Sequence, residues 1–168
     1  EYNPLTDTFL LLLHEFEGEF DGIPILHDAI AEYDRSGNLL WEWHGYEHIP
    51  FDPYEYMLRN ETWRRYMNTL SADWTHCNTI YWDIENDVIY LNSRHLDTFY
   101  KIDKTTGDIV WSCGRLGDFA LFNKHGNETI SLWYHSHALE PIGGNRFIIY
   151  DNDLWNLTSI DPMTGVSG

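Results

Sequence analysis

The sequence predicts an all-β fold, and three observations support that prediction. Of the 168 residues, 43% are hydrophobic and 16% are aromatic, which is enough apolar surface for a packed core. Aromatic rings pack well on pleated sheets, so this composition favours strands. The strand-like segments are short and separated by Asn, Asp and Gly, and one strand–turn–strand pattern recurs along the chain. We therefore expect sheets through most of the chain.

The recurring pattern is a hairpin signature, found at residues 32–43 and again at 101–111. In each copy an apolar residue and Asp precede a short polar turn with Gly, and an apolar stretch that reaches Trp follows. Glycine adopts the positive φ that such turns require. A third copy begins at residues 159–165. Spacings of roughly 58 to 69 residues are compatible with enlarged blades of a β-propeller.

These copies amount to about three blades, fewer than the four to eight that close a propeller ring. We therefore predict that residues 1–168 form a single partial propeller domain. Either the rest of the same propeller or another chain, as in a homo-oligomer, completes the ring. No initiator or signal peptide is recognisable at Glu1, so we expect an internal segment of a longer protein.

Further strands are expected wherever apolar, aromatic or β-branched residues run between turn residues. In chain order these are residues 8–13, 79–82, 87–93, 98–102 and 146–150.

One segment departs from the strand pattern. Asp52 offers an N-cap and Pro53 suits the first position of a helix. Residues 54–70 contain neither Gly nor Pro, and their apolar side chains recur roughly at helical spacing. We predict one inserted helix near 53–70 that packs against the sheets and does not bind a partner.

Charge and composition exclude several functions. The net charge is −17 with only three lysines, whereas binding to nucleic acid phosphates needs clustered cations. The longest apolar run, residues 9–13, is too short to span a membrane. Asn-x-Thr triplets at Asn60, Asn127 and Asn156 are candidate N-glycosylation sites. Together these features predict an extracellular, cell-surface or periplasmic protein without a nucleic acid partner.

Two cysteines, Cys77 and Cys113, are too few for a disulfide framework and lack the spacing of a metal site. One disulfide between them is left open. We predict no metal and no cofactor.

Three short stretches, residues 73–78, 92–95 and 133–138, concentrate His and Arg near the ends of expected strands. In a propeller, strand ends around the central channel converge on one cavity, so distant residues can share a site. Taken singly, each His is more often a hydrogen-bonded structural residue. Together they are the candidate site. Arg115 is interpreted as either a second anion contact or a turn residue.

The order of these motifs resembles the arylsulfotransferase family. The resemblance rests on the Asp-Trp-Thr-His-Cys-Asn run at 73–78, the Asn-Ser-Arg-His run at 92–95 with the hairpin after it, and Gly117-Asp-Phe. It continues through His137-Ala and Tyr150-Asp-Asn and extends upstream to residues 28–43. It implies a bladed propeller, usually six-bladed, that transfers sulfuryl groups from one phenol to another without the nucleotide sulfate donor. The implied partners are small phenolic donors and acceptors.

The resemblance also implies residue roles. His76 and Arg94 match family residues that grip the sulfate, and His137 matches the histidine that accepts the sulfuryl group transiently. The family usually has a Gln-His pair there, whereas this chain reads His135-Ser-His137, so His135 is an alternative nucleophile. His95 and Asn78, within the same motifs, are further candidates.

Elementary chemistry accounts for these residue types. Arginine offers a planar fork of donors to two sulfate oxygens, and its charge is independent of pH in the working range. A neutral imidazole is a competent nucleophile near pH 7, and a sulfurylated histidine divides the transfer into two easier halves, which gives ping-pong kinetics. His76 either stays protonated to stabilise charge or relays the phenol proton.

The sequence therefore predicts an aryl sulfate sulfotransferase. The alternative is a non-catalytic, glycosylated extracellular propeller with a binding or structural role, because a scaffold does not dictate function. A hydrolase that releases inorganic sulfate ranks last.

Overall fold

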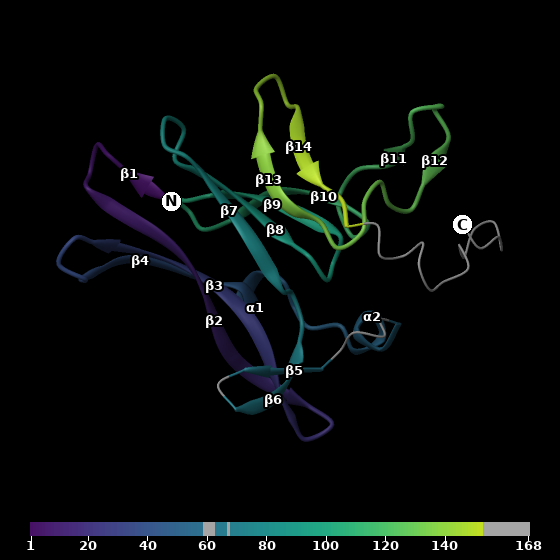
Figure 1. Ribbon diagram of the computed structural model, residues 1–168, viewed down its shortest axis with the longest axis horizontal. Helices are drawn as coiled ribbons and strands as arrows, with labels where there is room; N and C mark the ends of the chain where they lie inside the picture. Colours follow the sequence, from purple (N-terminus) through teal and green to yellow (C-terminus); the bar gives the residue numbers. More distant parts are fainter. Residues whose placement is uncertain (59–62, 67, 153–168) are drawn as a thin grey trace.

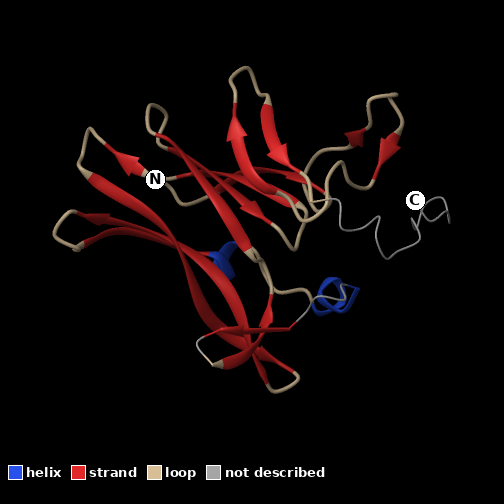
Figure 2. Ribbon diagram, viewed as in Figure 1, coloured by secondary structure: helices blue, strands red, loops and turns tan. Residues whose placement is uncertain are grey.

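The computed structural model describes residues 1–58, 63–66 and 68–152, and these residues form an all-β protein, as predicted (Figures 1 and 2). The first sheet follows the order β1-β2-β3-β6-β5, and β4 also pairs with β3. Its strands are β1 (Tyr2–Asn3), β2 (Thr8–Phe20), β3 (Ile23–Asp34), β4 (Leu39–His44), β5 (Trp63–Tyr66) and β6 (Thr69–Asp73).

The second sheet is an antiparallel meander in the order β10-β9-β8-β7. Its strands are β7 (Cys77–Asp83), β8 (Val88–Ser93), β9 (Thr98–Asp103) and β10 (Ile109–Gly114). Two small hairpins follow, β11 (Leu121–Phe122) with β12 (Glu128–Thr129) and β13 (His137–Pro141) with β14 (Phe147–Tyr150). Each strand expected from the sequence is present.

Both expected hairpin copies that fall in the described residues are confirmed, as β3–β4 and β9–β10. In the first, Asp34 Oδ1 accepts hydrogen bonds from the backbone N–H groups of Ser36 and Asn38, both at 2.8 Å. In the second, Asp103 Oδ1 accepts from the N–H of Thr105 at 2.8 Å. Gly37 and Gly107 have φ of +83° and +81° in the matching turns, where a side chain would be strained. The third copy, at 159–165, lies outside the described residues.

The predicted helix near 53–70 is only partly correct. Its start is confirmed, because Asp52 Oδ1 accepts from Tyr54 N–H at 2.8 Å and helix α2 (Pro53–Leu58) begins at the proline. The prediction is wrong for the second half, where β5 and β6 form a hairpin and Asn68 takes the turn with φ +67°. Strand β6 also pairs in parallel with β3, so a sheet partner outweighs the local helical pattern. Residues 59–62 and 67 lie outside the described residues.

The two hairpin copies contact each other, and this contact joins the two large sheets. The indole N–H of Trp43 donates to the carbonyl of Gly107 at 2.9 Å, so the Trp of one copy caps the turn of the other. Lys104 Nζ lies 2.7 Å from a Glu32 carboxylate oxygen and 5.1 Å from the ring centre of Trp82. The main hydrophobic core includes residues of both sheets. The two large sheets therefore pack together around a shared core.

The second sheet has the four-stranded antiparallel form of a propeller blade. No closed ring is formed by the part of the chain that the structure describes, so the six-bladed propeller stays a prediction. In those residues Cys77 and Cys113 are free thiols, and burial raises the pKa of each.

A short helix α1 (Gly45–His48) follows β4. Neither α1 nor α2 is long and apolar enough to cross a membrane, and no other helix occurs in the described ranges.

His27 gives the folded protein a predicted acid sensitivity. It is 3% exposed, its Nδ1 has no hydrogen-bond partner among the described residues, and burial lowers its pKa below the usual 6.5. The unfolded chain then binds the proton more readily, so stability falls as pH drops below about 6.5 towards the lower folded pKa. We expect His27→Gln to reduce this acid loss in urea unfolding at pH 5 and pH 7.5. An unchanged pH slope would contradict the assignment; exposed His125→Gln is the control.

Candidate active site

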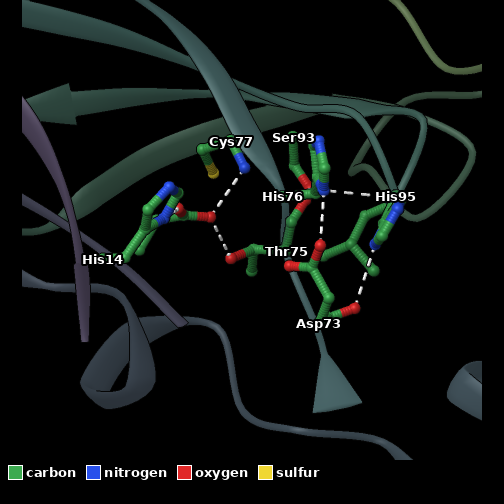
Figure 3. A network of polar contacts seen from close by, with 9 residues as sticks. His14, Asp73, Thr75, His76, Cys77, Ser93 and His95 are labelled. Carbon is green, nitrogen blue, oxygen red and sulfur yellow. Dashed lines mark hydrogen bonds and ion pairs between the residues drawn. The ribbon is translucent and has the colours of Figure 1, made fainter. Parts of the chain in front are cut away.

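Two loops bring the first group of predicted residues together: the segment between β6 and β7 and the turn between β8 and β9. They are fastened by backbone hydrogen bonds, from Arg94 N–H to the His76 carbonyl and from His95 N–H to the Thr75 carbonyl, both at 3.2 Å. The Ser93 hydroxyl also donates to the Thr75 carbonyl at 2.6 Å. Figure 3 shows these loops side by side. Antiparallel pairing of Cys77 with Ser93 sets their register.

Asp73, at the end of β6, holds two imidazoles at once. Its Oδ2 lies 2.5 Å from Nδ1 of His76, and its backbone carbonyl lies 2.9 Å from Nδ1 of His95 (Figure 3). A carbonyl or a carboxylate only accepts, so each Nδ1 carries a proton, and Nε2 is the ring nitrogen that can gain or lose one. The His76 and His95 rings are 4.5 Å apart between centres. His76 has φ +46°, a conformation that costs energy and often marks a functional position.

A buried carboxylate on the first sheet supports the same loop. Asp28 is 3% exposed, and its Oδ1 accepts from Nδ1 of the cross-strand residue His14 at 2.7 Å. Its Oδ2 accepts from the Thr75 hydroxyl at 2.5 Å and from the Cys77 N–H at 2.6 Å. Because Thr75 and Cys77 flank His76, Asp28 fixes the backbone on both sides of that histidine.

The loop before β13 docks onto the second sheet; it carries His135 and leads into His137, the first residue of β13. Asn78 Nδ2 and Asn92 Nδ2 donate to the Ser136 carbonyl at 2.8 and 2.9 Å. Asp97 Oδ1 accepts from the His135 N–H at 2.7 Å. The loop is therefore anchored at two consecutive residues, and the His95 and His135 ring centres lie 6.4 Å apart.

His137 is oriented by two contacts at one ring nitrogen. Its Nδ1 lies 3.1 Å from the His135 carbonyl and 3.0 Å from the side-chain amide of Asn152. The carbonyl requires a donor, so Nδ1 is protonated, and the Asn152 amide turned about its axis presents oxygen to the same proton. Nε2 then carries the lone pair. Among the described residues, no hydrogen bond engages that nitrogen.

Comparison with known proteins identifies the family of the chain. The sequence matches the family model described as Arylsulfotransferase (ASST) over residues 4–164, nearly the whole chain. The chain belongs to the arylsulfotransferase family. No match was found among curated proteins or among solved structures. Family membership supports an arylsulfotransferase-type function in general.

The candidate site residues expected from the sequence fall into one connected region. His76, His95 and His135 follow one another through ring contacts, and His137 contacts the His135 carbonyl. Arg94 is half-buried, and its backbone is bonded to that of His76. The guanidinium of Arg115 is engaged by two carboxylates, at 2.8 Å from Glu55 and 3.5 Å from Asp97, and Asp97 is also the acceptor for the His135 N–H.

Sequence reasoning assigned no role to three residues that the structure makes central: Asp73, Asp28 and Asn152. Asp73 has a local signal, because a carboxylate three residues before a His in a tight loop is within reach of its Nδ1. Asp28 has no local signal. One partner, His14, lies on the paired strand, and the other two, Thr75 and Cys77, are more than forty residues later in the chain. Asn152 is visible only once β13 and β14 are paired.

The described residues include a groove and a smaller pocket, and the groove lies at the ends of the β7–β8 and β13–β14 hairpins opposite to this region. A groove of about 680 Å³ lies between the β7–β8 turn and the β13–β14 turn and includes Tyr81, Tyr90 and Phe147. A pocket of about 340 Å³ includes Trp74 and Leu96, the neighbours of Asp73 and His95. None of His76, His95, His135 and His137 lines either hollow.

Asn78, a candidate site residue, has a structural position. Besides its bond to Ser136, its Oδ1 accepts from Asn92 Nδ2 at 2.9 Å and from the Thr79 hydroxyl at 3.1 Å. We expect Asn78→Ala to lower the free energy of unfolding by about 1–2 kcal/mol, because the buried Asn92 and Ser136 groups lose a hydrogen-bond partner. Urea unfolding measures this loss. A change below about 0.5 kcal/mol, the range of ordinary surface substitutions, would show that Asn78 does not fasten the loop.

Proposed function

We propose that this arylsulfotransferase moves a sulfuryl group from a phenolic sulfate ester to a phenol, by a ping-pong mechanism through His137. The observation that carries the proposal is the orientation of the His137 ring. Its Nδ1 is held by the His135 carbonyl and the Asn152 side chain, so the nucleophilic lone pair is on Nε2. Family membership supports the reaction class.

In the first half-reaction, Nε2 of His137 attacks the sulfur of the donor. The N–S bond forms as the S–O bond to the phenol breaks, and the electron pair leaves with the phenolic oxygen. His76, which enters the cycle with protons on both Nδ1 and Nε2, then supplies its Nε2 proton to that oxygen and is left neutral. In the second half, the acceptor phenol gives a proton to His76, its oxygen forms the new S–O bond, and the N–S bond returns its electron pair to Nε2. His76 therefore carries the proton in both half-reactions.

The supporting residues have separate roles in this scheme. The Asp73 carboxylate fixes the His76 ring so that Nε2 exchanges the phenol proton. Arg94, held next to His76 by the backbone, would bind the non-bridging sulfate oxygens, where the charge lies in the extended transition state. Asn152 and the His135 carbonyl position the nucleophile. No metal or organic cofactor enters the scheme.

We also propose that β7–β10 is one blade of a six-bladed propeller in an exported protein. The meander order of this sheet supports the blade. The glycosylation triplet at Asn127 lies on the exposed β11–β12 turn, which supports access to a glycosylating enzyme. Asn60 and Asn156 lie outside the described residues.

The test is covalent labelling. The protein is mixed with an aryl [35S]sulfate, digested at neutral pH and analysed by mass spectrometry, and a second sample then receives an unlabelled phenol. We expect label on the peptide that contains His137 and discharge of that label by the phenol. Label on His135 would transfer the nucleophile role to that residue. No label and no turnover with several activated donors would favour the non-catalytic binding propeller.

A further inference from the structure

One group of side chains near the nucleophile has a composition that the sulfuryl transfer alone does not require. Within residues 1–58, 63–66 and 68–152, Asp73, His76 and His95 are the one group of three His, Cys, Asp or Glu residues whose donor atoms lie within 4.8 Å of one another. Asp73 is 3% and His95 is 4% exposed, so two of the three are buried. Buried donors gathered this closely differ from the exposed acidic clusters that solvate a surface.

We propose that Asp73, His76 and His95 form a binding site for a divalent transition-metal ion of the Zn²⁺ type. One carboxylate oxygen and two imidazole nitrogens form a donor set that suits zinc, and water completes the coordination. The ion takes the place of the proton between Asp73 Oδ2 and His76 Nδ1, which is released to solvent.

The site is preorganised by contacts outside the donor atoms. His95 Nδ1–H donates to the Asp73 carbonyl, so the ring is fixed with its basic Nε2 directed away from that bond. Metal-binding histidines commonly use such a bond from the second nitrogen to a carbonyl. The backbone bonds of Arg94 to His76 and of His95 to Thr75 hold the two loops at a set separation. Little rearrangement is needed to bring three donors to one ion.

Other histidine–carboxylate contacts in the described chain fit an ion less well. Glu15 and Glu42 both approach His44, but Glu15 contacts Nδ1 at 2.7 Å and Glu42 contacts Nε2 at 3.8 Å, so they face opposite sides of the ring. One ion cannot use both carboxylates with that imidazole. Asp28 faces His14, yet it already accepts three hydrogen bonds. Neither contact gathers three donors around one point.

The site has a consequence for activity, which rests on the proposed sulfuryl transfer. With the ion on Nδ1 of His76, the one remaining ring proton is on Nε2, so the ring can no longer take a proton from the acceptor phenol and transfer stops. Zinc would therefore inhibit transfer at concentrations that match its binding.

Binding is tested by titrating the chelator-treated chain with Zn²⁺ in a calorimeter. We expect one equivalent per chain, with affinity reduced by at least about tenfold in His95→Gln and in Asp73→Asn. The matched controls are His44→Gln and His125→Gln, which are expected to bind like the wild type. Equal zinc affinity in the wild type and His95→Gln, or loss of the binding in His44→Gln, would overturn the proposal. Circular dichroism checks that each variant is folded.

If the variants fail to fold, a measurement on the wild-type protein tests the metal site. Diethyl pyrocarbonate modification is followed by mass spectrometry with and without Zn²⁺. We expect zinc to protect the peptides that contain His76 and His95 and to leave His125 unprotected; protection at neither histidine would overturn the proposal. In the transfer assay, we expect zinc inhibition to require about tenfold more Zn²⁺ in His95→Gln. If no transfer occurs, the proposed function fails, while titration and protection still decide the metal site.

Discussion

His137→Ala is expected to reduce sulfuryl transfer by at least about a thousand-fold while the protein remains folded, because losing a nucleophile removes the covalent route. The ring is half-buried at the start of β13, and its substitution removes the contacts to the His135 carbonyl and Asn152. Both are single hydrogen bonds, so the loss of stability should be about 1 kcal/mol. Steady-state kcat with an activated aryl sulfate, together with the fraction of labelled protein, measures the effect.

The matched variant is His135→Ala. The backbone carbonyl of His135, which the substitution keeps, contacts His137. We therefore expect a loss of activity of no more than about tenfold, the size of an indirect effect on orientation. The reverse result, with His135→Ala inactive and His137→Ala active, would move the nucleophile to His135. Asn152→Ala should lie between the two, because it loosens the nucleophile and leaves the imidazole in place.

The parts of the fold that sequence predicted well are those with local causes. Each hairpin copy depends on an aspartate that accepts hydrogen bonds from its own turn and on a glycine with positive φ, and both residues lie within the motif. The Asp52–Pro53 start of α2 is equally local. Such features can be predicted from sequence because the interacting residues are close together in the chain.

The errors and omissions have non-local causes. The second half of the helix predicted near residues 53–70 is replaced by strands. Ala72 and Asp73 of β6 pair with β3, more than forty residues earlier in the chain. His76 and His95 stand side by side because Cys77 pairs with Ser93, and that register cannot be derived from the spacing of the histidines. The motifs did indicate the right loops. The distances between these motifs could be known only from the pairing of the strands. The same holds for the group formed by Asp73, His76 and His95.

Asp28→Ala is the stability change with the largest expected effect, a loss of about 3–5 kcal/mol in the free energy of unfolding. Removal of this carboxylate, which is 3% exposed, leaves three donors without their acceptor: the His14 ring, the Thr75 hydroxyl and the Cys77 N–H. Thr75→Val removes one of these donors and should cost only about 1–2 kcal/mol. Urea unfolding of the two variants measures the difference. Equal costs would show that the Asp28 charge has no role beyond its bond to Thr75.

The same substitution tests whether the first sheet positions the site on the second. Thr75 and Cys77 flank His76, whose φ of +46° persists only while its neighbours are held. Under conditions where Asp28→Ala remains folded, we expect kcat to fall by about a hundredfold, since a misplacement near 1 Å in a reacting group has effects of that order. Thr75→Val keeps the bond from Cys77 to Asp28 and should retain most of the activity. A folded Asp28→Ala protein with full activity would mean that the loop holds His76 without the first sheet.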